Sequence, residues 1–121
     1  MISLSRILCL TALMGLSHTS ISANLLDAQE MAFQQKLDHA MQRIEQTKLI
    51  LDDTEITATP LEQQKALCDR LNAYREIILL AEEFDQVEQA HAMKRVAQFY
   101  LNQQSEQFDQ SGITLETWCK S

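Results

Sequence analysis

The stretch from Leu61 to Ser111 contains no glycine and no proline. These two residues are the strongest breakers of regular structure, so a stretch of this length favours helices over β folds rich in turns. The whole chain of 121 residues has only two glycines and one proline, which also disfavours collagen-like and linker-rich sequences. A single helix from Pro60 to Gln104 is about 67 Å long, too long for a compact domain of this size. The sequence therefore predicts helices with at least one break inside the stretch.

Apolar residues recur every three or four positions, which is typical of amphipathic helices. The first predicted helix covers 26–51 and ends before an acidic, threonine-rich stretch, because aspartate and glutamate are unfavourable at a helix C-terminus. Its predicted inward residues are Phe33, Leu37, Ala40, Ile44 and Leu51, widened by Met41.

The second predicted helix begins after Thr59, where Thr59, Pro60 and Glu62 form a capping-box pattern with proline at the first helical position. This helix is apolar on all sides near its end, so we expect it to be the central one. We place the next break at Phe84–Asp85, where Asp85 and Glu88 have the spacing of a second capping box. The third helix is expected to run to about residue 102, with residues 105–110 either extending it or forming another turn. Its expected inward residues are Ala90, Met93, Val96, Ala97, Tyr100 and Leu101.

Gly112 is the expected stop, after which Thr114 can cap a short last helix that carries Trp118 and Cys119. The connections are short, which favours antiparallel neighbours. The predicted fold class is all-α, a small up-and-down bundle of three or four helices.

Residues 1–23 have the three-part layout of a secretory signal peptide: a short start with Arg6, an apolar run of ten residues at 7–16, and a polar stretch ending at Ala23. The apolar run is about half of the roughly 20 residues that span a bilayer. We expect cleavage after Ala23, with cleavage after Ser22 as a close alternative, and a single domain at 24–121 in the periplasm or outside the cell. The alternatives are a lipid anchor on Cys9 and a retained, buried N-terminal helix.

Two cysteines, Cys68 and Cys119, remain after such cleavage. An even pair in a small exported chain indicates one disulfide. The bond would close a loop of about 50 residues and contribute roughly 4 kcal/mol by chain entropy. Neither cysteine has a second cysteine nearby in the sequence, which argues against a zinc site.

Candidate cofactor ligands are few. Glu88 and His91 have the Glu-x-x-His spacing of carboxylate-bridged metal bundles, but the other histidine of the predicted domain, His39, has Lys36 three residues before it. An exposed helical pair explains Glu88 and His91 as well. Together with methionines at 31, 41 and 93, these residues form the alternative hypothesis, a metal- or haem-carrying bundle. We expect no cofactor and find no pattern of catalytic residues.

Ten basic and seventeen acidic residues give a net charge of −7. This charge argues against nucleic acid and anionic membranes and favours a basic protein partner. The expected protein is small, helical and exported, with one disulfide. In this layout it is similar to bacterial immunity proteins against toxins delivered into the periplasm, although no sequence motif carries the similarity. We therefore expect a non-enzymatic protein that acts by protein–protein contact, of the inhibitor or immunity type.

Overall fold

The computed structural model describes residues 17–52, 55 and 57–120, and for residues 17–23 it describes the backbone alone. The chain forms four helices: α1 (Ser17–Leu51), α2 (Pro60–Glu83), α3 (Glu88–Gln110) and α4 (Leu115–Lys120). All regular structure over the described residues is helical, which confirms the predicted all-α bundle. None of these helices, within the described part, is long and apolar enough to cross a membrane.

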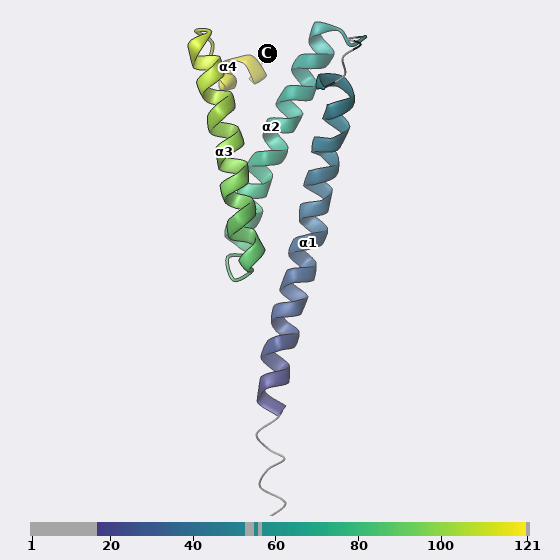
Figure 1. Ribbon diagram of the computed structural model, residues 1–121, viewed down its shortest axis with the longest axis vertical. Helices are drawn as coiled ribbons and strands as arrows, with labels where there is room; N and C mark the ends of the chain where they lie inside the picture. Colours follow the sequence, from purple (N-terminus) through teal and green to yellow (C-terminus); the bar gives the residue numbers. More distant parts are fainter. Residues whose placement is uncertain (1–16, 53–54, 56, 121) are drawn as a thin grey trace, which may run out of the picture.

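The middle helix of the bundle is α2, which packs against α1 on one side and α3 on the other. Figure 1 shows that α1 runs on past the turn between α2 and α3, so its N-terminal part projects from the bundle. We call residues 24–34 of α1, which include part of this projection, together with residues 84–92, the open end. The opposite part, where α4 lies beside α2 and α3, is the closed half.

The core lies between the three long helices, and from residue 24 onward Phe33 is its first fully buried residue along α1. The expected central position of α2 is confirmed, although Leu79 on its outer side is exposed. The principal buried apolar residues are Phe33, Leu37, Ala40, Ile44, Ala73, Ile77, Leu80, Ala81, Val87, Ala90 and Ala97.

The start of α2 forms the capping box that the sequence predicts. The Thr59 hydroxyl accepts from the Glu62 backbone N–H at 3.2 Å, and the Glu62 carboxylate accepts from the Thr59 backbone N–H at 2.7 Å. Pro60 occupies the first helical position. Two backbone donors at the helix start are thereby satisfied, which fixes where α2 begins.

The break between α2 and α3 falls where the sequence predicts it, but the second capping box is wrong. The residue before α3 is Val87, which has no side chain able to cap. Its side chain is buried at 2% exposure. Burying a valine contributes about 1.5–3 kcal/mol, against about 1 kcal/mol for a side-chain cap, so the turn is arranged around Val87 instead of Asp85.

The buried faces of α1 and α3 each differ from expectation at one position. Thr47, which is not among the inward residues expected on the first helix, lies on the buried face of α1, where its hydroxyl donates to the Ile44 carbonyl at 2.6 Å. Val96 is 54% exposed, although its spacing suggested an inward position. The small side chain of Ala97 faces the core, and the neighbouring Val96 is turned about 100° away around the helix.

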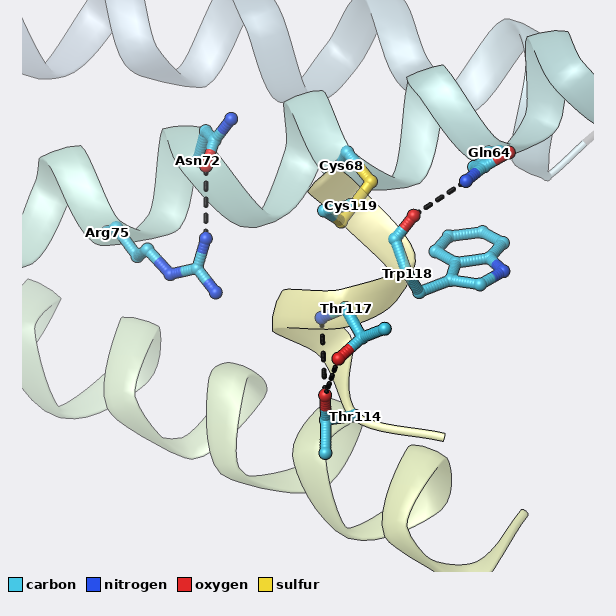
Figure 2. The surroundings of a disulfide bond; sticks show 8 residues. All are labelled: Gln64, Cys68, Asn72, Arg75, Thr114, Thr117, Trp118 and Cys119. Carbon is cyan, nitrogen blue, oxygen red and sulfur yellow. Dashed lines mark hydrogen bonds between the residues drawn. A yellow bond between two sulfur atoms is a disulfide. The ribbon is translucent and has the colours of Figure 1, made fainter. Parts of the chain in front are cut away.

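The closed half is fastened by α4 and the disulfide. Figure 2 shows Cys119 of α4 bonded to Cys68 of α2, with α-carbons 5.7 Å apart, which confirms the predicted pairing. Gly112 has a positive φ of 79° and turns the chain after α3. The Thr114 hydroxyl accepts from the Thr117 backbone N–H at 3.2 Å, as expected for the cap of α4.

Candidate interaction surface

The candidate metal ligands lie at separate places in the bundle. His39 is on α1, where it lines a groove between α1 and α2. Glu88 and His91 are in the first turn of α3, and the His91 Nε2 lies 2.8 Å from the Asp85 carbonyl oxygen. Within the described part of the chain, no three His, Cys, Asp or Glu side chains lie together in a way that could hold a metal ion.

The α1–α2 groove contains charges that already have partners. Lys36 Nζ lies 3.2 Å from Glu83 Oε1 and 5.2 Å from the centre of the Phe84 ring. Arg43 binds Glu76 and also Asp69, the latter at 3.3 Å. These pairs join α1 to α2 across the groove. Its lining residues are Gln35, Lys36, His39, Ala40, Glu76, Leu79, Leu80 and Glu83.

A second groove lies at the open end, between the projecting part of α1 and the start of α3. We call it the α1–α3 groove. Its lining residues are Asp27, Glu30, Met31, Gln34, Val87, Glu88, Gln89 and Ala92. The two walls come from segments more than 50 residues apart in sequence, and the turn around Val87 brings them together.

Three carboxylates, those of Asp27, Glu30 and Glu88, line the α1–α3 groove and are exposed. No lysine or arginine lines it, and none of the three carboxylates forms an ion pair with another described residue. Carboxylates that repel one another without a neutralising cation create a negative potential, which attracts cations. The groove is therefore suited to a positively charged partner.

The same groove offers apolar surface beside the carboxylates. Met31 is 66% exposed, and methionine adapts its shape to different partners. Residues 24–31 of α1 are all exposed, and their apolar side chains Leu25 and Leu26 contribute nothing to the core. Residues 24–31 are thus not needed to fill the bundle.

The closed half has the opposite character, because its partly buried cation, Arg70, has partners within the chain. Arg70 donates through Nε to the Thr47 hydroxyl at 2.7 Å and through Nη2 to Asp52 at 3.2 Å. Burial works to lower the pKa of Arg70, but hydrogen bonds with Tyr100 and Asp52 outweigh it, and the pKa is raised above its ordinary value. Arg70, on α2, thus joins Thr47 of α1 to Tyr100 of α3.

Tyr74 and Tyr100 stack beside this arginine, with ring centres 4.1 Å apart. Burial first, and then the proximity of Tyr100, raise the pKa of Tyr74 above 10.0. Nearby Arg70 and Lys48 oppose the shift without cancelling it. The neutral phenol is thus the form that the folded chain favours.

Sequence reasoning did not single out Asp27 and Glu30. A usable signal is present: no lysine or arginine occurs from residue 24 to 35 or from 85 to 93, while both stretches contain acids. The sequence does not show that these two stretches lie side by side, because this depends on how far α1 extends past the α2–α3 turn.

A comparison with known proteins finds no matching family model, no matching curated protein and no matching solved structure.

Proposed function

We propose that this chain is exported, loses its first 23 residues, and acts without catalysis by binding a basic partner protein at the α1–α3 groove, as an inhibitor or immunity-type protein does. The observation that carries the proposal is the set of three carboxylates, at Asp27, Glu30 and Glu88, that line one groove together without a cation.

Export is supported by the place of the expected cut. Cleavage after Ala23 falls within α1, nine residues before Phe33, the first buried side chain from residue 24 onward. The mature chain would keep every buried residue that the structure describes. The Cys68–Cys119 disulfide is a bond that persists in oxidising compartments.

Charge supports a basic partner. Loss of Arg6 with the signal leaves nine basic residues against seventeen acidic ones, a net charge of −8. Elsewhere many carboxylates are paired within the chain, as Glu82 is with Lys94 and Glu83 is with Lys36. Long-range attraction would guide a basic protein to the α1–α3 groove, where three unpaired carboxylates line one surface, and salt would weaken this attraction.

Affinity capture from the native envelope tests the binding proposal. The bait is the mature chain as wild type, as Asp27→Asn/Glu30→Gln/Glu88→Gln (the groove variant), or as a control with the same change of charge. The control is Glu106→Gln/Asp109→Asn/Glu116→Gln, which alters exposed carboxylates far along the chain from the groove. We expect the wild type and the control to retain a stoichiometric basic protein at low salt and the groove variant to lose it. Equal capture by all three baits, or capture of none, would contradict the proposal.

N-terminal sequencing of protein recovered from the envelope tests export separately. The expected N-terminus is Asn24, or Ala23 for the alternative cut. A chain that still begins at Met1, or a lipid on Cys9, would show this part of the proposal to be wrong.

A further inference from the structure

The exposed face of α3 continues the α1–α3 groove. Ala92, which lines the groove, is followed at helical spacing by Val96, Phe99 and Gln103. Positions separated by four, three and four residues share one face of a helix. All four side chains are exposed, Val96 by 54% and Phe99 by 65%. We call this face the α3 stripe; it is about 17 Å long at 1.5 Å per residue.

The α3 stripe carries no charge, in contrast to the groove at its N-terminal end. Its one charged neighbour in the middle is Arg95, four residues before Phe99 and hence one turn away. Arg95 is exposed and has no ion pair among the described residues. The surface therefore changes along α3 from negative at Glu88 to apolar, with a positive flank, at Phe99.

We infer that the partner presents an amphipathic helix that lies along α3, with its cationic end against Asp27, Glu30 and Glu88 and its apolar end against Val96 and Phe99. This inference rests on the proposed function and adds the partner's polarity and shape to it. A cationic end placed beside Arg95 would be repelled. At the other end of the stripe, Glu106 follows Gln103 as a single carboxylate, so the three carboxylates of the groove favour the stated direction of the bound helix. Helix recognition by apolar anchors at three- and four-residue spacing is a common mode of binding.

A second copy of this chain fits the surface less well. Each copy carries a charge of −8 without its first 23 residues, and a like-charged partner would add carboxylates to a groove that lacks cations. An anionic membrane is disfavoured for the same reason.

Two synthetic helical peptides test the inference by fluorescence anisotropy against the mature chain. One carries lysine and arginine at one end and leucine at the other, and the second has the same charges with serine in place of leucine. We expect the amphipathic peptide to bind the wild type about tenfold more tightly than the serine peptide, since burial of one large apolar side chain accounts for about a factor of ten. Absence of measurable binding by the amphipathic peptide, or equal binding of both, would overturn the inference.

Variants then locate the binding site. Phe99→Ser and Val96→Ser should each weaken the amphipathic peptide about tenfold. Leu49→Ser, a control at a residue that is 78% exposed on α1, should stay within about twofold. If the groove variant abolishes binding while the two stripe variants bind as the wild type does, the inference is wrong and the proposed function stands. If the groove variant also binds the amphipathic peptide as the wild type does, both the inference and the proposed function are wrong.

Two further measurements would identify a different occupant. A wild-type dimer in analytical ultracentrifugation that Phe99→Ser converts to a monomer would show that a second copy covers the stripe. Binding to phosphatidylcholine vesicles that Phe99→Ser abolishes would show that the stripe meets a lipid surface. Either result overturns the inference, and we expect a monomer that does not bind these vesicles.

Discussion

The closed half and the open end of this bundle use polar and apolar side chains in opposite ways. In the closed half, Arg70 is bonded to Thr47 and Asp52, and α4 is held to α2 by the Cys68–Cys119 bond. At the open end, a groove of three carboxylates has no cation, and the apolar side chains beside it face solvent.

This difference assigns the stability of the fold to one set of side chains and the binding of a partner to another. Side chains whose partners lie within the chain stabilise the fold, and their loss leaves a buried group or a cavity behind. Exposed side chains without partners contribute little to folding, so they are available for another molecule. Substitutions of these partnered side chains in the closed half should therefore lower the free energy of unfolding, and substitutions of exposed side chains at the open end should alter binding alone.

Removal of the disulfide should give the largest effect on stability. Cys68→Ser/Cys119→Ser should lower the free energy of unfolding by about 2–5 kcal/mol, because the unfolded chain regains the entropy of an open loop. The bond spans 51 positions of the chain. Urea unfolding followed by circular dichroism measures the change, and wild-type protein kept in reductant is the matched control. An unfolding midpoint equal to that of the oxidised wild type would contradict the role given to this bond.

Loss of the partly buried arginine, Arg70, should come next. Arg70→Met should cost about 1–3 kcal/mol, because Thr47 and Asp52 lose their charged donor. The matched control is Arg75→Met on the same helix, since Arg75 is exposed and donates to Asn72 one turn away. We expect the control to stay within about 0.5 kcal/mol of the wild type. Equal losses in the two variants would show that charge alone, and not the network around Arg70, is responsible.

Much of the fold follows from local sequence signals. The end of α1 at Leu51, the Thr59 cap, the break near Phe84, the Gly112 turn and the disulfide all agree with expectation. Each depends on residues close together in the chain or, for the disulfide, on a single available pairing. The Asp85 cap fails because burial of Val87, a tertiary effect, outweighs a local hydrogen bond.

Less of the candidate site than of the fold could be predicted from the sequence. Charge indicated a basic partner but not where it would bind, because the positions of unpaired carboxylates depend on which helices meet. Val96 was expected in the core, since periodicity gives the spacing of an apolar face but not which neighbouring helix covers it. Glu88 was weighed as a metal ligand and lies in the α1–α3 groove.

Alkaline pH should weaken the closed half by a smaller amount. The pKa of Tyr74 is raised in the folded chain by burial and by Tyr100, so the folded state holds this proton more tightly than the unfolded state does. The resulting stability is fully present below about pH 10 and is lost as the pH rises through the folded-state pKa. Melting temperatures of wild type and Tyr74→Phe between about pH 9 and pH 11 measure the effect. We expect a shallower decline for Tyr74→Phe, and parallel curves would contradict this assignment.

The groove variant should have the smallest effect on stability. Removing Asp27 and Glu30 relieves repulsion between like charges one turn apart, by a few tenths of a kcal/mol. Removing the charge of Glu88 from the first turn of α3 costs about 0.3–1 kcal/mol through the helix dipole. Because the two changes oppose each other, we expect a free energy of unfolding within about 0.5 kcal/mol of the wild type.

The most direct test of the account measures both properties on this one variant. Thermal unfolding and binding to the partner captured from the envelope are recorded side by side for wild type, the groove variant and the Glu106→Gln/Asp109→Asn/Glu116→Gln control. We expect three similar melting curves, with binding lost in the groove variant alone and weakened by salt in the other two. Unchanged binding by the groove variant, or loss of binding that accompanies unfolding, would contradict the assignment of function to the open end.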